Sequence, residues 1–275
     1  MKGGVQISIQ RSIIWNMPAS DPGFSQSLER GLAVLSTFTP DRPALGISEL
    51  ARRLDLTRST THRYVATLAT LGYLQQDEST RKYRLGPRVL DLGFSMLGSL
   101  ELREIAAPHL RRLTDSTGHT SNLAIRDDTD VILIDRVRGR PGRYHHLEFT
   151  LHVGSRLPSY CSATGKALLA FLPRPDLDQL LDRIDFVQRG PRTLTSKKAL
   201  LAELDHVRRI GVAVNDEELE SALRSIAVPV RSRSGQVIAA VNIAIPWSPE
   251  AITELVGQHA PVLQATARQI AARVI

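Results

Sequence analysis

Residues 57–63 read TRSTTHR and gather side chains that can contact nucleic acid. Arginine can donate two hydrogen bonds to O6 and N7 of a guanine, and hydroxyl groups can donate to phosphates or bases. A helix that begins here would also present its N-terminus to a phosphate. We therefore expect DNA contacts from Thr57, Arg58, Ser59, Thr60, His62 and Arg63.

Two short helices must position these residues. The first, SELARRL, begins with Ser48 as a predicted N-cap and turns Leu50, Ala51 and Leu54 inward. The second has Thr57 as its N-cap and ends before Gly72, at a C′ position. Its predicted buried face carries Thr61, Tyr64 or Val65, Leu68 and Leu71. The polar residues then face outward, which is typical of a helix-turn-helix whose second helix enters the major groove.

A hairpin is predicted directly after these helices. Two strand-like runs, 73–75 and 82–85, flank a polar turn at 77–80. Arg81 and Lys82 follow that turn, and we expect them to meet the DNA backbone or minor groove as a wing. Between residues 42 and 88, nine Lys and Arg stand against four Asp and Glu, so most of the net charge of +7 lies there. The alternative is a helical hairpin with a solvated basic face.

Composition excludes several classes of protein. The chain has 275 residues and one cysteine, Cys161, which excludes a disulfide framework and a site with several thiolates. No apolar run reaches about 18 residues, so we expect no membrane span and a cytoplasmic protein. Polar residues interrupt the apolar ones in residues 1–16, so we expect no signal peptide there. We expect 1–16 to be dispensable and 1–22 to be a disordered extension.

The rest of the chain mixes strands and helices without regular βαβ spacing. After Gly118 we expect strands at 121–125, 131–137, 146–152, 211–214, 226–230 and 237–245, and helices at 165–171, 197–209 and 249–274. This pattern predicts an α+β domain with a largely antiparallel sheet. The predicted organisation is a winged helix-turn-helix over 23–86, a linker helix over 87–100 and a second domain over 101–275. The apolar surface of the linker helix would pack against a second copy or cover the second domain.

The chain resembles the IclR family of bacterial transcriptional regulators over about residues 25–273. The resemblance is carried by SLERGLAVLSTF, ISELARRLDLTRSTTHRYVATLATLGYL, YRLGPRVLDLG, GSRLPSYCSATGKALLAFL and LRSIAVPVRSRSGQVIAAVNIA. It implies an N-terminal winged helix-turn-helix, a linker helix and a C-terminal effector domain similar to the GAF fold. It also implies dimers or tetramers that bind palindromic promoter DNA and respond to small organic acids. Within the family, the chain is most similar to the β-ketoadipate-pathway branch, whose members control aromatic-acid catabolism. The segments that carry this similarity are RLPSYCSATGKALLA and ELESALRSIAVPVR.

The resemblance also implies an effector site. Its residues would be Arg156, Tyr160, Ser162, Ala163, Thr164, Asn215, Ser225 and Asn242. Free N–H groups where a helix begins favour an anion, and Arg156 is a candidate carboxylate clamp. Family members often have an acidic residue at position 215, a cysteine at 225, and serines where this chain has Asn242 and Ala244. These departures favour a larger acid with an apolar body, such as an aromatic carboxylate or a β-ketoadipate-pathway intermediate.

Simpler explanations stand beside these assignments. Serine and threonine at a helix start are often only caps, Cys161 is a small buried hydrophobe, and Asn215 can support a turn. The segment SYCSATGKA lacks the P-loop pattern, and no G-x-S-x-G motif occurs in the chain. His145, His146 and His152 do not form a metal-binding motif. We therefore expect that the protein is not an enzyme and binds no cofactor or metal. The alternative function is a metabolite-sensing or protein-interaction module without sequence-specific DNA binding. The basic surplus argues against that alternative.

Overall fold

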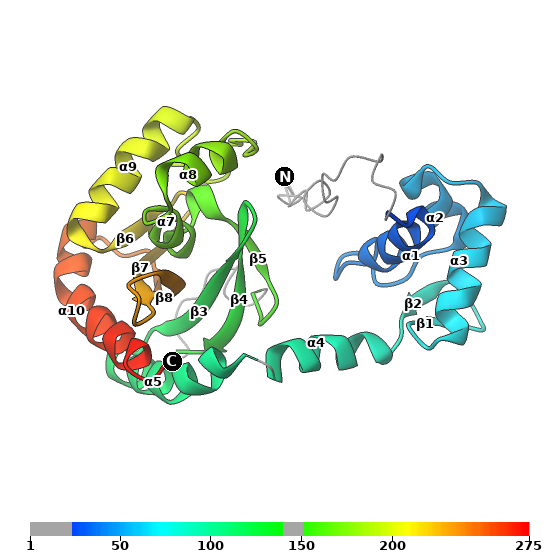
Figure 1. The fold of residues 1–275 in the computed structure, drawn as a ribbon, viewed down its shortest axis with the longest axis horizontal. Helices are drawn as coiled ribbons and strands as arrows, with labels where there is room; N and C mark the ends of the chain where they lie inside the picture. Colours follow the sequence, from blue (N-terminus) through cyan, green and yellow to red (C-terminus); the bar gives the residue numbers. More distant parts are fainter. Residues whose placement is uncertain (1–23, 99, 140–150, 275) are drawn as a thin grey trace. The chain divides into compact units, whose positions relative to one another are not determined.

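The computed structural model describes residues 24–98, 100–139 and 151–274. It divides into two compact units, which meet in the chain between Met96 and Leu97 and are described separately below (Figure 1). The extension predicted for residues 1–22 lies outside the described residues. So do His145 and His146.

In the described part of the first unit, three helices precede a two-stranded hairpin. The helices are α1 (Gln26–Ser36), α2 (Ile47–Leu54) and α3 (Arg58–Thr70), and the antiparallel strands are β1 (Leu74–Gln76) and β2 (Tyr83–Leu85). A small core forms between them from Val34, Phe38, Leu45, Leu50, Val65, Leu74 and Tyr83. The helix α4 (Arg88–Gly98) follows the hairpin. The predicted helix-turn-helix with a wing is therefore present.

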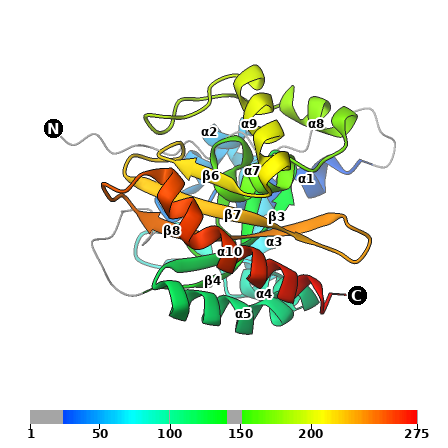
Figure 2. The ribbon, with the colours of Figure 1, turned by 90° about the vertical axis from the view of Figure 1, so that its left-hand side faces the viewer.

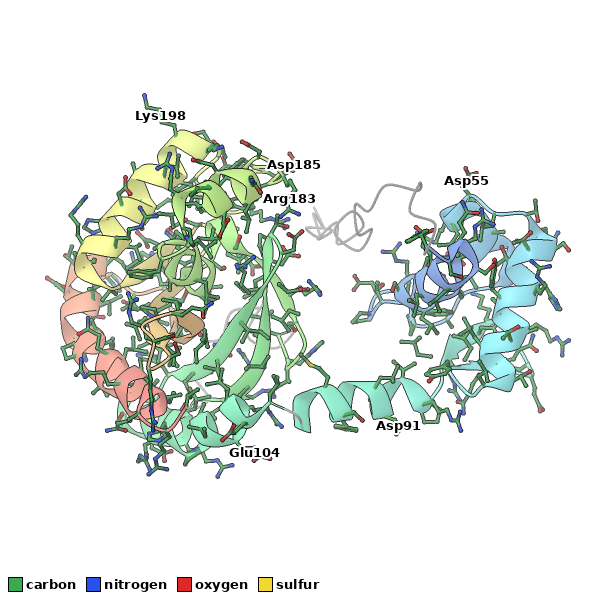
Figure 3. The ribbon with its side chains drawn as sticks, viewed as in Figure 1. Asp55, Asp91, Glu104, Arg183, Asp185 and Lys198 are labelled. Carbon is green, nitrogen blue, oxygen red and sulfur yellow. The ribbon has the colours of Figure 1, made fainter. Side chains whose placement is uncertain are left out.

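Two details of the helix-turn-helix differ from the prediction. The helix α2 begins at Ile47 with Gly46 as its N-cap, not at Ser48, because Leu45 exchanges two backbone hydrogen bonds with Tyr83 of β2. The chain is extended up to that bridge and can turn into a helix directly after it. Leu71 is 46% exposed and not buried, because α3 has ended and Gly72 turns the chain at φ 80°. Asp55, in the left-handed conformation, makes the turn from α2 to α3, with its side chain exposed (Figure 3).

The second unit is built on a six-stranded sheet with order β5-β4-β3-β8-β7-β6. Every neighbouring pair is antiparallel, which confirms the predicted α+β class with an antiparallel sheet. The strands are β3 (Thr120–Asp127), β4 (Asp130–Val137), β5 (Arg156–Pro158), β6 (Ala213–Asp216), β7 (Leu223–Arg231) and β8 (Val237–Pro246). The strand predicted at 146–152 is wrong at Leu151 and His152, which lie in no strand, and its other residues are not described.

Helices cover both faces of this sheet (Figure 2). One face packs on α5 (Glu101–Thr117) and α10 (Ile252–Ala271), around Leu110, Ile226 and Leu263. The other face packs on η1 (Ser159–Cys161), α7 (Ala163–Leu169), α8 (Arg174–Leu181) and α9 (Lys197–Ile210). Sheet residues alternate between the two cores, as strand geometry requires. No helix within the described ranges is long and apolar enough to cross a membrane.

Candidate nucleic-acid interface and effector cavity

The outer face of α3 carries the predicted DNA-contacting residues. Thr61 and Val65 are buried in the core of the first unit, so Arg58, Ser59, His62 and Arg63 are all exposed. Ala66, Thr67 and Thr70 continue the same face at helical spacing from Ser59 and line a shallow depression with it. The prediction did not include these three residues, although their i, i+3 and i+4 spacing was available in the sequence.

The two threonines at the start of α3 serve the helix itself. The Thr57 hydroxyl accepts a hydrogen bond from the Thr60 backbone N–H at 3.2 Å, which confirms the predicted N-cap. The same hydroxyl donates to the Thr60 hydroxyl oxygen at 2.8 Å. These contacts fix where α3 begins and therefore where its N-terminal N–H groups point. The exposed Arg58, Ser59, His62 and Arg63 remain as the groups that can reach bases or phosphates.

The hairpin tip is held by one carboxylate. Asp77 accepts hydrogen bonds from the side-chain hydroxyls and backbone N–H groups of Ser79 and Thr80, at 2.6–3.0 Å. These bonds, led by the Ser79 hydroxyl, lower the pKa of Asp77 to about 2. Arg81 follows in the left-handed conformation, and both Arg81 and Lys82 are exposed. The local folding of this turn thus presents two cations at the end of the wing.

The second unit contains a small cavity between the sheet and the start of α7. Six of the eight predicted effector residues line it, namely Ser162, Ala163, Thr164, Asn215, Ser225 and Asn242. Its volume is about 30 Å³, which is room for on the order of two water molecules. The cavity must therefore widen before a benzoate-sized molecule can enter.

The cavity has a polar side and an apolar side. Asn122 and Arg136 join the predicted polar residues, and the apolar side is formed by Leu133, Leu151, Leu157, Leu219, Leu223 and Ala244. Among the described residues that line the cavity, Arg136 is the one formal charge, and there is no Asp or Glu. This electrostatic environment favours an anion that also has an apolar body.

Arg136 and Asn122 were missing from the prediction. The Arg136 Nη1 donates to the Asn122 Oδ1 at 2.7 Å, and the Asn122 Nδ2 donates to the Asn242 Oδ1 at 2.9 Å. The strand register places all three side chains opposite one another on β4, β3 and β8. Asn122 lies in a predicted strand, but the sequence does not show which residue of the next strand stands beside it.

Two predicted effector residues lie elsewhere. Arg156 is exposed on β5 and pairs with Asp127 and, at 4.0 Å, with Asp130, so its charge is already matched. Tyr160 is buried, donates its hydroxyl to the Val187 carbonyl oxygen at 2.7 Å and accepts from the Arg189 Nε at 3.2 Å. Neither residue lines the cavity.

Ser162 and Asn215 line the cavity while they also stabilise its walls. The Ser162 hydroxyl accepts from the Gly165 N–H at 3.2 Å and donates to the Pro158 carbonyl oxygen at 2.8 Å. The Asn215 Oδ1 accepts from the backbone N–H groups of Glu218 and Leu219 at 2.8 and 3.2 Å. Ser162 therefore caps α7, and Asn215 supports the turn after β6, as the simpler explanations predicted.

The neighbouring Cys161 is not a nucleophile in this environment. Its side chain is fully buried, and burial raises the pKa of the thiol to about 12. The thiol is therefore protonated near neutral pH. Across the described parts of the chain, no three His, Cys, Asp or Glu residues lie close enough to hold a metal ion.

Gly165 and Lys166 hold α7 in close contact with the segments that pack around it. A Cβ on Gly165 would lie 2.1 Å from the Ser159 carbonyl oxygen, so only glycine allows the helix to approach this closely. Lys166 is 1% exposed, and its Nζ donates to the Glu218 carboxylate and, at 3.3 Å, to the Glu203 Oε1. Burial raises the pKa of Glu218, and the Lys166 ammonium opposes that shift. These contacts fasten α7 to the turn after β6 and to α9.

A helix-turn-helix with a basic wing, followed in the chain by an α+β unit with a partly polar cavity, is the arrangement of a DNA-binding protein with a separate sensor domain. Residues 27–78 match the IclR helix-turn-helix domain, and residues 94–272 match the C-terminal domain of the bacterial transcriptional regulator IclR. The chain therefore belongs to the IclR family of bacterial transcriptional regulators. It is a DNA-binding regulator that responds to a small-molecule effector.

Several relatives extend this comparison. The Pca regulon regulatory protein of Pseudomonas putida is 38% identical over 251 residues, which cover 91% of this chain and 84% of that protein. A transcriptional regulator from Rhodococcus sp. RHA1 is 38% identical with a TM-score of 0.76, covering 90% of this chain and 98% of the other. An IclR homologue from Microbacterium hydrocarbonoxydans, crystallised with 4-hydroxybenzoate, is 29% identical with a TM-score of 0.75 and the same coverage.

Proposed function

We propose that this regulator controls a catabolic operon for aromatic acids and that its effector is an aromatic carboxylic acid or an acid of the β-ketoadipate pathway. The observation that carries the proposal is the composition of the cavity. Its one formal charge is the Arg136 cation, no acidic residue lines it in the described part of the chain, and leucines form the opposite wall. Two relatives support the choice of ligand, since one is named for the Pca regulon and another was crystallised with 4-hydroxybenzoate.

The DNA contacts are assigned to the exposed face of α3 and to the wing. Arg58, Ser59, His62 and Arg63 would enter the major groove, where Arg63 can read a guanine. Arg81 and Lys82 would neutralise phosphates and add affinity without sequence preference. Thr57 and Thr60 contribute by shaping the start of α3 and its N–H groups.

We assign the active form to a dimer, or a tetramer built from dimers, on palindromic DNA. The helix α4 exposes Leu90, Leu92, Phe94 and Met96, each 44–66% accessible. A solvated apolar surface of this size on one helix favours burial against a second copy. Residues 87–100 would then be the linker helix between a DNA-binding domain over 23–86 and a sensor domain over 101–275. Two recognition helices would reach half-sites about one or more DNA turns apart.

No catalytic role is assigned to the second unit, and the protein would act in the cytoplasm, where bacterial promoters are. Calorimetry of the full chain with 4-hydroxybenzoate, β-ketoadipate and glyoxylate tests the ligand class. We expect heat of binding with 4-hydroxybenzoate or β-ketoadipate and none with glyoxylate. Binding of glyoxylate alone would contradict the proposal.

A further inference from the structure

The leucines around the cavity differ in how deeply they are buried. Leu133 and Leu223 line it, are buried, and belong to β4 and β7. Three other leucines of the wall are only partly buried, namely Leu151, Leu157 and Leu219. A side chain that borders both the cavity and solvent can turn outward without opening the core. Because the cavity has room for about two water molecules, at least one wall side chain must move when an aromatic acid binds.

Leu219 lies in the connection between β6 and β7, residues 217–222, and its backbone is held in place. The Asn215 Oδ1 accepts from the backbone N–H groups of Glu218 and Leu219 at 2.8 and 3.2 Å. The Glu218 carbonyl oxygen accepts from the Gly190 N–H at 3.0 Å. Backbone groups that are paired in this way keep a turn in one conformation. A movement at this position is therefore a rotation of the Leu219 side chain.

Leu157, on the other side of the cavity, is more expensive to move. It lies on β5 opposite Val131 of β4, which is fully buried. Residues opposite one another in a sheet share a face, so an outward turn of Leu157 would also uncover Val131. Leu219 lies between two strands and stands opposite no residue in the described sheet. Of the two leucines, Leu219 can therefore turn outward with the smaller loss of buried apolar area.

The sheet beside Leu219 presents a row of small and polar side chains. Asn215 on β6 stands opposite Ser225 on β7, and Ser225 stands opposite Ala244 on β8. All three line the cavity together with Leu219. A flat ring can rest on the short side chains of Ser225 and Ala244. The space that the Leu219 side chain occupies therefore decides whether such a ring has room.

We propose that Leu219 is a plug that determines which acids the effector site accepts. In the free protein its side chain fills the space that an aromatic ring takes on binding, and it turns into solvent when the acid enters. This inference rests on the proposed function, in which the cavity takes an aromatic carboxylic acid. A smaller residue at position 219 would then favour wider rings, and a larger residue would exclude them.

The test is calorimetric binding of 4-hydroxybenzoate and the wider 6-hydroxy-2-naphthoate to the full chain. Leu219→Ala should bind 4-hydroxybenzoate on the order of 3- to 10-fold more tightly than wild type, because no leucine then has to leave the cavity wall. Its gain should be greater for the naphthoate, by on the order of 10-fold. Leu219→Trp should weaken the binding of both acids. Leu219→Met keeps the volume of the side chain and should bind both acids nearly as wild type does.

Two further leucine variants are the matched controls. Leu157→Ala shortens a fixed part of the same wall and should weaken the binding of 4-hydroxybenzoate, because the ring loses a contact. Leu201 is a partly buried leucine of α9 that packs on the same core and does not line the cavity, so Leu201→Ala should bind both acids as wild type does. The urea midpoint of each variant shows that the second unit is folded.

The outcomes separate this inference from the proposed function. Unchanged or weaker binding of 4-hydroxybenzoate by Leu219→Ala would show that Leu219 is a fixed wall, and would overturn the inference while the aromatic effector stands. A gain in Leu151→Ala or Leu157→Ala and none in Leu219→Ala would place the movable side chain elsewhere and overturn it as well. If wild type and Leu219→Ala both bind β-ketoadipate alone, the inference fails and the pathway assignment stands. If wild type binds none of these acids, the proposed function fails and the inference fails with it.

Discussion

Replacing Lys166 with methionine should destabilise the second unit and make its stability depend strongly on pH. Lys166 is 1% exposed and donates to the Glu218 carboxylate, which is itself buried. Methionine keeps the length and packing of the side chain but leaves a buried carboxylate without its cation. Breaking a buried pair in this way costs about 3–5 kcal/mol in the free energy of unfolding. In a unit of this size, that loss lowers Tm by on the order of 10 °C.

The direction of the pH dependence follows from Glu218. Burial raises the pKa of this carboxyl above its ordinary value of 4.5, so the folded state binds a proton more readily than the unfolded chain. The stability it contributes is therefore complete below about pH 4.5 and is lost as the pH rises through the folded pKa. Without the Lys166 ammonium, the folded pKa rises further. The deficit of Lys166→Met relative to wild type should therefore be larger at pH 8 than at pH 5.

Urea titration followed by circular dichroism at pH 5, 6.5 and 8 measures both effects. Two controls isolate the pair. Lys166→Met with Glu218→Leu removes both charges and should recover much of the loss, because no buried charge then lacks a partner. Lys197→Met breaks a surface pair with Asp182 and should leave the midpoint nearly unchanged. A Lys166→Met protein with the midpoint and pH profile of wild type would refute the reasoning.

Three further predictions concern α3, the wing, Gly165 and Cys161. Arg63→Ala should cost about 1–3 kcal/mol in the free energy of binding to the native promoter and relax specificity at one base pair. Lys82→Ala should weaken binding to all DNA sequences alike and reduce the slope of log affinity against log salt concentration by about one. Anisotropy titrations over a range of salt concentrations separate the two outcomes. Gly165→Ala should lower the midpoint of the second unit in urea, because the new Cβ would lie 2.1 Å from the Ser159 carbonyl oxygen, and an unchanged midpoint would show that α7 can shift freely. Iodoacetamide at pH 8 should alkylate Cys161 only after unfolding, since the pKa of the buried thiol is about 12, and rapid labelling of the folded protein would contradict this.

The parts of this fold that depend on local pattern could be predicted from the sequence. The N-cap of α3 at Thr57, the turn at Gly72 after its end and the hairpin all follow from caps, turns and periodicity. The start of α2 could not, because a bridge between Leu45 and Tyr83, far apart in the sequence, determines it. The sheet was predictable as antiparallel, since no regular βαβ spacing occurs, but its strand order was not.

The same distinction applies to the effector site. Ser162, Ala163 and Thr164 were found through the motif that they share with the IclR family, and the structure places them in the cavity wall. Arg156 was chosen because it precedes that motif in the chain, yet it pairs with Asp127 outside the cavity. The charged residue of the cavity, Arg136, is brought to Asn122 by a bulge in β4. A one-residue change of register leaves no signal in a single sequence, so this residue required the structure.

The central claim is that the exposed face of α3 reads promoter DNA and that a molecule in the sensor domain controls this binding. Fluorescence anisotropy of the full chain on the DNA upstream of its own gene, with a scrambled duplex of equal length as control, tests it at one ionic strength. We predict tighter binding to the native duplex, loss of that preference in Arg63→Ala, and a changed affinity for the native duplex when 4-hydroxybenzoate or β-ketoadipate is added. Equal binding to both duplexes, with and without the acids, would contradict the account.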